Sequence, residues 1–205
     1  TSLLHRARTS RYGVLVTPTL SFDERGHQPN VITYAVLGVD EEGTLPREFF
    51  PVVEDFIGAG GTLDWPEAIV RDVSGVGPEY AIDGYEAIGG LRFAPIELAP
   101  NQSRSFVLIL AILDNDAEPN ELIERYGTAA KFEHWLAHTE QYWSKKLDTL
   151  QVATGDGRFD QWLRWMTLQP TLRRLAGNSW LPYHDYGRGG RGWRDLWQDI
   201  LALLM

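Results

Sequence analysis

The 205-residue sequence contains no cysteine, and this absence excludes several kinds of chemistry. Without thiols there is no disulfide framework, no thiolate metal site and no cysteine nucleophile. The absence agrees with a reducing compartment, so we expect a cytoplasmic protein. No apolar run approaches the roughly 18–20 residues of a membrane span, and TSLLHRARTSRYG lacks the apolar centre of a signal peptide. The chain begins with Thr rather than Met, so we expect residue 1 to be an internal point of a longer protein.

Basic residues are also scarce, with 19 Lys and Arg against 28 Asp and Glu and a net charge of -9. A nucleic-acid-binding protein needs a basic face to neutralise phosphates. We therefore expect neither a nucleic acid nor a membrane as partner, and the acidic balance fits a neutral substrate well.

The residues present are those of a globular protein, with 43% hydrophobic and 23% charged. Aromatic residues reach 12%, and five of the eight Trp lie within residues 162–197. Aromatic faces stack on sugar rings, but large aromatics also fill cores, and enrichment alone favours the core.

Residues 1 to about 113 have the pattern of an antiparallel β-sandwich. Short β-branched or aromatic runs, GVLVTPTLSF, NVITYAVLGVD and SFVLILAIL, are bounded by Gly, Pro, Asn and Asp. The continuous apolar run of residues 106–113 predicts a strand buried on both faces. APNQS before it predicts a turn, and Asp83-Gly84 predicts a hairpin turn. The Gly- and Pro-rich FFPVVEDFIGAGGTLDWPEAIV predicts a long loop.

From Pro119 the period changes to that of helices. A first helical pattern runs over residues 120–132 and continues or restarts to Trp143, after which LDTLQVAT is an extended connector. Asp156-Gly157 leads into a third helical segment, which we expect to be interrupted or kinked at Pro170. LWQDILALLM begins a further apolar helix.

The stretch of residues 178–199, NSWLPYHDYGRGGRGWRDLWQD, is the densest in chemical groups. Its glycines permit close approach of a ligand, its Arg side chains are rigid forks of donors, and its carboxylates accept hydrogen bonds. Such a set can hold the vicinal hydroxyls of a hexose, or form a surface turn held by Arg–Asp pairs. The glycines do not satisfy a nucleotide-binding fingerprint, because no Lys-Ser/Thr pair follows them.

Three other groups favour ordinary structural roles. His134 and His138 have the spacing of two metal ligands on a helix, but no third ligand is evident. Asp114, Asp116 and Glu118 lack the central Gly and terminal Glu of a calcium loop. Residues 64–67, Asp-Trp-Pro-Glu, suit a sugar contact, but packing is the favoured interpretation.

NSWLPYHDYGRGGRGWRDLWQDILALL resembles the start of the catalytic barrel in the family 94 glycoside phosphorylases, the cellobiose and chitobiose phosphorylase group. FIGAGGTLDWPEAI and GLRFAPIELAPNQSRSFVLILAI resemble that family's N-terminal β-domain, and YWSKKLDTLQVATGDGRFDQWL resembles its helical linker. The resemblance implies an N-terminal β-sandwich over residues 1–116, a helical linker over 117–150 and the start of an (α/α)6 barrel over 151–205.

The resemblance also implies an activity and a set of site residues. Such enzymes cleave β-linked disaccharides or oligosaccharides with inorganic phosphate as co-substrate and without a cofactor, inverting the anomeric centre to give an α-sugar 1-phosphate. By position, Arg188 and Asp195 match the pair that holds the glycosyl unit, and Arg194, Gln198 and Asp199 match residues that support it. The extra residue between Arg188 and Arg194, and His184, depart from the pattern and leave the sugar open.

The general-acid Asp and the phosphate-holding groups of the family lie in motifs that this sequence lacks. We therefore expect no catalytic residue in this chain and no activity from it alone. The expected partners are the β-linked oligosaccharide, phosphate, and either a second copy or another chain carrying the remaining barrel. The alternative is a non-catalytic carbohydrate-binding or interaction module. A hydrolase of the glucoamylase or trehalase kind shares the architecture but not RGWRDLWQD.

Overall fold

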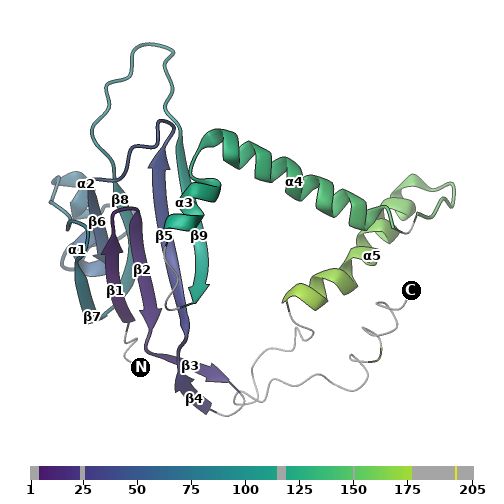
Figure 1. Ribbon diagram of the computed structural model, residues 1–205, viewed down its shortest axis with the longest axis horizontal. Helices are drawn as coiled ribbons and strands as arrows, with labels where there is room; N and C mark the ends of the chain where they lie inside the picture. The colour runs from purple at the N-terminus through teal and green to yellow at the C-terminus, as the bar shows by residue number, and fades with distance from the viewer. Residues whose placement is uncertain (1–4, 24–25, 115–118, 150, 177–196, 198–205) are drawn as a thin grey trace. The chain divides into compact units, whose positions relative to one another are not determined.

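A computed structural model describes residues 5–23, 26–114, 119–149, 151–176 and 197 of the chain (Figure 1). The chain divides into two compact units. The first comprises Thr1–Ser21 and Pro29–Trp135, and the second comprises Phe22–Gln28 and Leu136–Met205.

The first unit is built on a five-stranded sheet. Its strand order is β7 (Ala81–Tyr85), β1 (His5–Ser10), β2 (Gly13–Pro18), β5 (Ile32–Asp40) and β9 (Phe106–Asp114). Every neighbouring pair is antiparallel, and β5 and β9 pair along their whole length, from Ile32 opposite Asp114 to Asp40 opposite Phe106. The β-branched and aromatic runs of the sequence thus form strands, as predicted.

One face of this sheet carries the main hydrophobic cluster. Tyr12, Leu15, Ala35 and Leu37 are buried there, and Leu15 and Leu37 have no exposed surface. Helix α3 (Asn120–Tyr126) supplies Leu122 and Ile123 to this cluster, and alternate residues of β9 supply Ile109, Ala111 and Leu113. This face is therefore covered by a helix and not by a second sheet.

The other face is covered in part by a two-stranded antiparallel sheet of β6 (Glu48–Val52) and β8 (Ala87–Arg92). Strand β8 contacts β2 and β5, and β6 contacts β1 and β2. The approach is close because Gly89 lies on the Val36 side chain, where an added Cβ would come within 2.3 Å of Val36 Cγ2. The two sheets confirm the predicted antiparallel sandwich.

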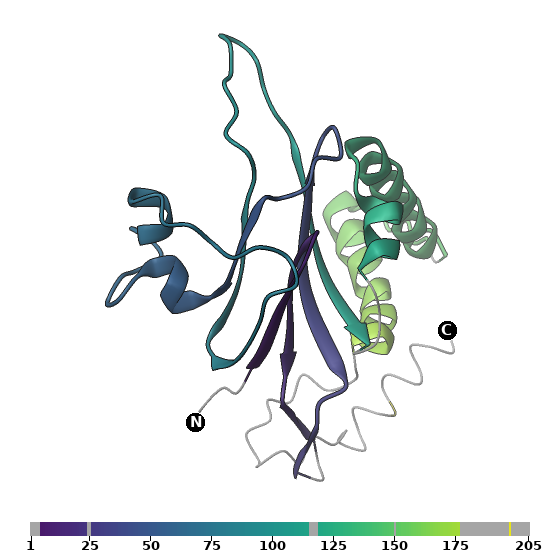
Figure 2. The ribbon, with the colours of Figure 1, turned by 60° about the vertical axis from the view of Figure 1, so that its left-hand side comes forward.

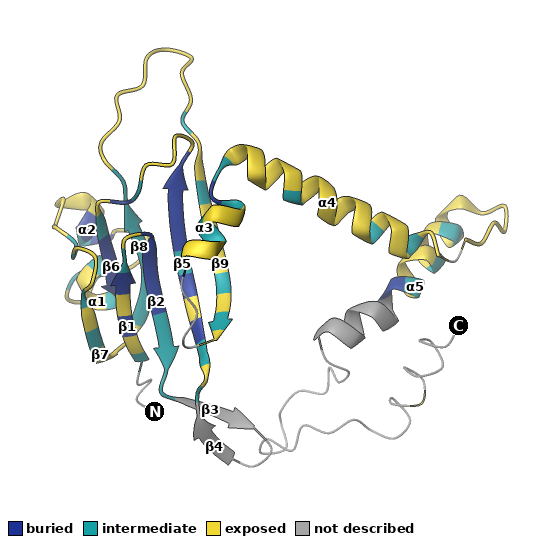
Figure 3. Ribbon diagram, in the orientation of Figure 1, coloured by how far each residue is buried: buried dark blue, intermediate teal, exposed yellow. Residues whose placement is uncertain are grey.

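Strand β9 differs from the prediction of a strand buried on both faces. It is an edge strand of the five-stranded sheet, and its residues alternate between half-buried and exposed (Figure 3). Leu108, Leu110 and Ile112 are 62%, 80% and 69% exposed. A continuous apolar run is compatible with a buried or an edge position, and the strand order decides between them.

The predicted hairpin turn at Asp83-Gly84 is wrong. Both residues lie inside β7, which pairs with β1, and β8 pairs with β6 instead of β7. The register of β1 and β7 shifts opposite Gly84, whose φ is 87°. Asp83-Gly84 therefore forms a β-bulge, for which glycine supplies the positive φ.

The loop predicted over residues 49–70 begins instead with a buried strand, since residues 49–52 belong to β6. The rest of it contains two short helices, α1 (Val53–Ile57) and α2 (Glu67–Val70), joined by a loop. The segment that carries them stands out from the sheet (Figure 2). The predicted turn at APNQS is confirmed, since the Gln102 amide donates to the Ala99 carbonyl at 2.9 Å and Asn101 has a φ of 66°.

The helical part follows the predicted change of period. The single helix predicted over residues 120–132 is wrong, because α3 ends at Tyr126 and α4 (Ala129–Leu147) begins after Gly127 and Thr128. Beyond residue 132 the helix continues, since α4 runs without a break to Leu147. Lys145 and Lys146 in the last turn of α4 oppose the negative end of its dipole. Helix α5 (Gly157–Ala176) runs through Pro170, so the expected interruption there is wrong. Strands β3 (Leu20–Asp23) and β4 (Gly26–Pro29) pair with each other.

The described residues contain the β-sandwich and, after it, the helices α3, α4 and α5. They do not test the predicted (α/α)6 barrel. The boundaries predicted at residues 116 and 150 also stay predictions. No described helix is long and apolar enough to cross a membrane.

Candidate functional site

The residues predicted to hold a sugar, Arg188, Arg194, Asp195, Gln198 and Asp199, lie outside the described part of the chain. Within residues 178–199 only Trp197 is described, and 58% of its surface is exposed. The structure therefore neither brings the predicted pair together nor separates it.

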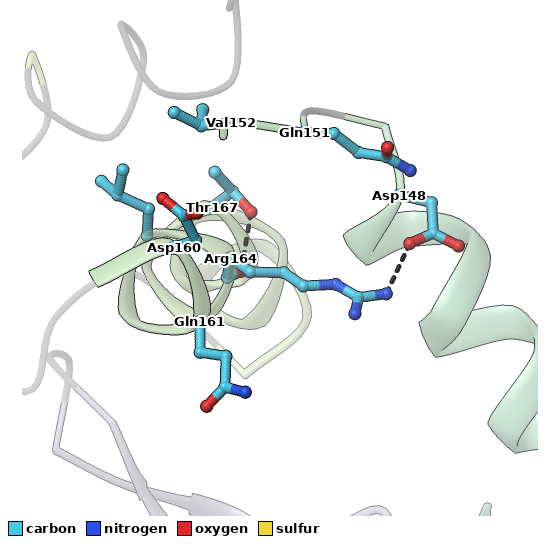
Figure 4. Close-up of a pocket in the computed structure, with 8 residues that line it drawn as sticks. Asp148, Gln151, Val152, Asp160, Gln161, Arg164 and Thr167 are labelled. Atoms are coloured by element: carbon cyan, nitrogen blue, oxygen red, sulfur yellow. Dashed lines mark hydrogen bonds and ion pairs between the residues drawn. The ribbon is translucent and has the colours of Figure 1, made fainter. Parts of the chain in front are cut away.

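The described part of the second unit contains a hollow of about 320 Å³ beside the start of α5. It lies between the end of α4, the connector after it and the first half of α5 (Figure 4). Two apolar side chains, Val152 and Leu163, contribute to its wall. The polar side chains that line it are Asp148, Gln151, Asp160, Gln161, Arg164 and Thr167.

The connector is held against the helix by a cap at Asp156. Its Oδ1 accepts hydrogen bonds from the backbone amides of Arg158 and Phe159 at 3.0 and 3.2 Å, as an N-cap residue does. Asp160 accepts at Oδ1 from the amide and hydroxyl of Thr154 at 3.0 and 2.6 Å. These bonds explain why the connector ends and α5 begins within the segment TGDGRFD.

An ion pair between Arg164 of α5 and Asp148 at the end of α4 forms one wall of the hollow (Figure 4). Both side chains are nearly half exposed, at 47% and 44%. Water screens such a pair, so its main effect is to join the end of α4 to α5. One oxygen of Asp160 is likewise occupied by Thr154, so neither carboxylate stands free as a catalytic base.

The chemistry of the hollow suits a neutral, hydroxyl-bearing ligand. Gln151, Gln161 and Thr167 offer both donors and acceptors. Asp148 and Arg164 compensate each other's charge, whereas Asp160 accepts only from the neutral Thr154. Elsewhere on α5, Phe159 and Trp162 stack with ring centroids 5.6 Å apart, and both residues are about half exposed. Sequence reasoning missed this hollow, because its lining residues meet only when the connector folds back on α5.

The first unit contains two arginine clusters that the sequence did not reveal. Arg104 bridges to Asp40, Glu41 and Glu42 at 2.6, 3.3 and 2.8 Å. Asp40 also accepts from the amides of Glu42 and Thr44 at 2.9 and 2.7 Å. Burial acts to raise the pKa of Asp40, but the bonds from Arg104 and the two amides outweigh burial and lower it. The DEEG turn after β5 was the available signal, since Asp often binds amides two residues on.

The second cluster is centred on Arg92. Its guanidinium contacts Glu48 at 2.8 Å and Asp72 at 3.3 Å, and it donates to the carbonyls of Ala68 and Val73. The pKa of Glu48 is lowered, first by a hydrogen bond from the Gly75 amide and then, against the effect of burial, by Arg92 and Arg47. Both arginine clusters consist of ion pairs that tie loops to strands. In the first of them the Arg104 Nε is buried without a hydrogen-bond partner among the described residues.

His134 and His138 are exposed on α4, and His134 lies edge-on to Trp135 at 5.5 Å. Among the described residues no three His, Cys, Asp or Glu side chains are grouped as metal ligands. Asp114 is exposed, and Asp116 and Glu118 lie outside the described residues.

Comparison with known proteins gives one family. The family model of the glycosyl hydrolase 94 supersandwich domain matches residues 23–129, which is more than half of the chain. The match runs from the last residue of β3 to the start of α4. It includes the β6–β8 sheet and strands β5, β7 and β9 of the five-stranded sheet, whereas β1 and β2 precede it. No curated protein matches the chain.

Proposed function

Since the chain belongs to glycosyl hydrolase family 94 through its supersandwich domain, we propose that it is a segment of an inverting glycoside phosphorylase. The proposed reaction cleaves a β-linked gluco-oligosaccharide with inorganic phosphate and releases an α-sugar 1-phosphate. Family membership is the observation that carries this proposal, because it restricts the chemistry to glycosidic bonds.

The step proposed for the anomeric carbon needs no nucleophile from the protein. A phosphate oxygen attacks from the face opposite the leaving group, and the bond to the leaving oxygen breaks as an acid protonates that oxygen. We place the acid outside these 205 residues. The role of this chain is to hold the glycosyl unit, with the Arg188 guanidinium and the Asp195 carboxylate on neighbouring hydroxyls.

Phosphate dependence is the first test of this function. The complete protein incubated with cello- or laminari-oligosaccharides and phosphate should give the ³¹P signal of an α-sugar 1-phosphate. Without phosphate the substrate should remain intact. Free glucose released by water alone would assign the protein to the hydrolases and contradict the proposal.

The sugar-holding role is tested by a matched pair of substitutions in the same glycine-rich run. Arg188→Ala should lower kcat/KM by roughly 100-fold or more, because it removes charge-assisted bonds to the sugar. Arg191→Ala removes an identical side chain three residues away, at a position that does not match the family pattern, and should retain most of the activity. Equal losses in the two variants would point to a loop-stabilising role for both arginines.

A non-catalytic carbohydrate-binding module is the second candidate. The hollow between α4 and α5, with its amide and hydroxyl groups, favours it. Titration calorimetry of the 205-residue chain with the same oligosaccharides separates the two functions. Tight binding without any phosphorolysis by the complete protein would favour the module.

A further inference from the structure

The segment between α1 and β7 presents a tryptophan to solvent. Trp65 is 70% exposed, although burial of such a ring is usually among the larger stabilising contributions in a fold. Among the described residues no ring or cation contacts the Trp65 indole. The expectation that residues 64–67 serve packing therefore fails for Trp65 itself, whereas the next residue, Pro66, is buried.

The backbone that carries Trp65 is held in place from both sides. Before it, the Gly61 amide donates to the Gly58 carbonyl at 3.0 Å and the Trp65 amide donates to the Thr62 carbonyl at 3.2 Å. After it, Pro66 and Ala68 are buried, and Pro66 restricts the backbone of the residue before it. The exposed ring is thus displayed by a fixed loop.

Arg92 of β8 anchors the same loop to the β-sandwich. It donates to the Ala68 carbonyl and, at 3.0 Å, to the Val73 carbonyl, and its ion pair with Glu48 is only about one-fifth exposed. The Glu48 carboxylate in turn accepts from the Gly75 amide at 3.0 Å. This anchoring reduces the entropy that would be lost when a ligand orders the loop.

A free carboxylate lies next to the exposed ring in the sequence. Asp64 is exposed, and no hydrogen bond or ion pair within the described part of the chain involves its side chain. An apolar ring face beside an unpaired acceptor matches a sugar, which has C–H groups on its face and hydroxyl donors at its rim.

The size of the exposed surface also favours a sugar over a protein partner. A Trp side chain offers roughly 150–250 Å², whereas a standard protein interface takes about 800 Å² from each partner. The remaining exposed apolar side chains of the segment are aliphatic and offer no flat ring: Leu63, Ile69, Val70 and Val73.

We propose that Trp65 and Asp64 form an accessory binding site for the glucosyl rings of a β-linked oligosaccharide. The proposal rests on the proposed function, because that function supplies the ligand class. Trp65 stacks on a ring, and the Asp64 carboxylate accepts a hydrogen bond from a hydroxyl at its edge. The site holds a distant part of a long substrate and takes no part in bond cleavage.

Calorimetric or NMR titration of the 205-residue chain with cello- and laminari-hexaose tests the site directly. Trp65→Ala should weaken binding at least tenfold, and Asp64→Asn should weaken it severalfold. Phe132→Ala, which removes another half-exposed aromatic ring, should leave this binding unchanged. Thermal melting should show that all three variants fold, since each altered side chain is exposed.

Failure of the accessory site is distinguishable from failure of the proposed function. In the complete protein, Trp65→Ala should lower kcat/KM for hexaoses while leaving disaccharide phosphorolysis unchanged. Absence of hexaose binding by the unsubstituted chain, or equal loss in the Trp65 and Phe132 variants, would overturn the site but not the activity. Loss of self-association in Trp65→Ala without any effect on sugar binding would assign the surface to a protein contact instead.

Discussion

Asp40 is a buried carboxylate kept ionised by its surroundings. Its side chain is 6% exposed, and it accepts hydrogen bonds from the Arg104 guanidinium and from two backbone amides. Arg104 arrives from the segment just before β9, so the charge pair fastens that segment to the turn that follows β5. Removing Arg104 would leave the buried Asp40 carboxylate with only its two backbone amides. Removing Asp40 would leave Arg104 paired only with the more exposed Glu41 and Glu42.

The lowered pKa values of Asp40 and Glu48 predict how stability depends on pH. A carboxyl whose pKa is lower in the folded state stabilises the protein above its ordinary pKa, which is 3.8 for Asp and 4.5 for Glu. That stability is lost as pH falls through the folded-state value. We expect the free energy of unfolding to be level near neutrality and to fall below about pH 4.

Substitution of Asp40 should change both the free energy of unfolding at neutral pH and its dependence on pH. Asp40→Asn should lower the free energy of unfolding by about 1–3 kcal/mol at pH 7, because Arg104 loses its buried partner. It should also make the fall of that free energy below about pH 4, the acid limb, less steep. Asp83→Asn serves as the control, since the Asp83–Arg6 pair spans 4.0 Å and leaves both side chains about 70% exposed. Urea unfolding at pH 7, 5 and 3.5 measures the effect, and an unchanged acid limb in Asp40→Asn would contradict it.

At the scale of elements, adjacent strands of one sheet place leucines in opposite surroundings. Leu37 of β5 has no exposed surface, whereas Leu110 of the edge strand β9 is 80% exposed. Leu110 pairs with Val36, the residue next to Leu37, so the two leucines lie on opposite faces of the sheet.

This contrast gives a matched prediction with the same chemical change at both sites. Leu37→Ala should cost about 2–5 kcal/mol, since it leaves a cavity in the cluster with Leu15 and Ala35. Leu110→Ala should change the free energy of unfolding by no more than about 0.5 kcal/mol. Chemical denaturation of both variants provides the measurement. A large cost at Leu110 would mean that the outer face of β9 is covered in solution.

At the scale of the whole molecule, the two units differ in what stabilises them. The first unit has a buried core between sheet and helix, whereas α4 contains no buried residue. Strands β2 and β5 are hydrogen-bonded to neighbours along both edges. Helices with little burial open more readily than interior strands.

Hydrogen exchange should therefore separate the units. Amides of β2 and β5 should exchange slowest, with opening free energies close to that of global unfolding, and amides of α4 should exchange orders of magnitude faster. Mass spectrometry of proteolytic fragments resolves these segments. Equal protection of α4 and β5 would show that α4 is stabilised by packing that the described contacts do not contain.

The sequence by itself determined the features that contiguous residues encode. The order of strands before helices and the family follow from local periodicity and motif, whereas the break between α3 and α4 at Gly127 was not predicted. Arg188 and Asp195 were likewise proposed from a motif, and because they lie outside the described residues their pairing stays a prediction.

Only the tertiary structure decided what depends on distant segments meeting. It placed β9 at an edge, turned Asp83-Gly84 into a bulge opposite β1, and joined Asp40 to Arg104 across 64 positions. It also left Trp65 exposed while burying Pro66 beside it. A side chain's exposure depends on whether another part of the chain covers it, and local sequence does not contain that information.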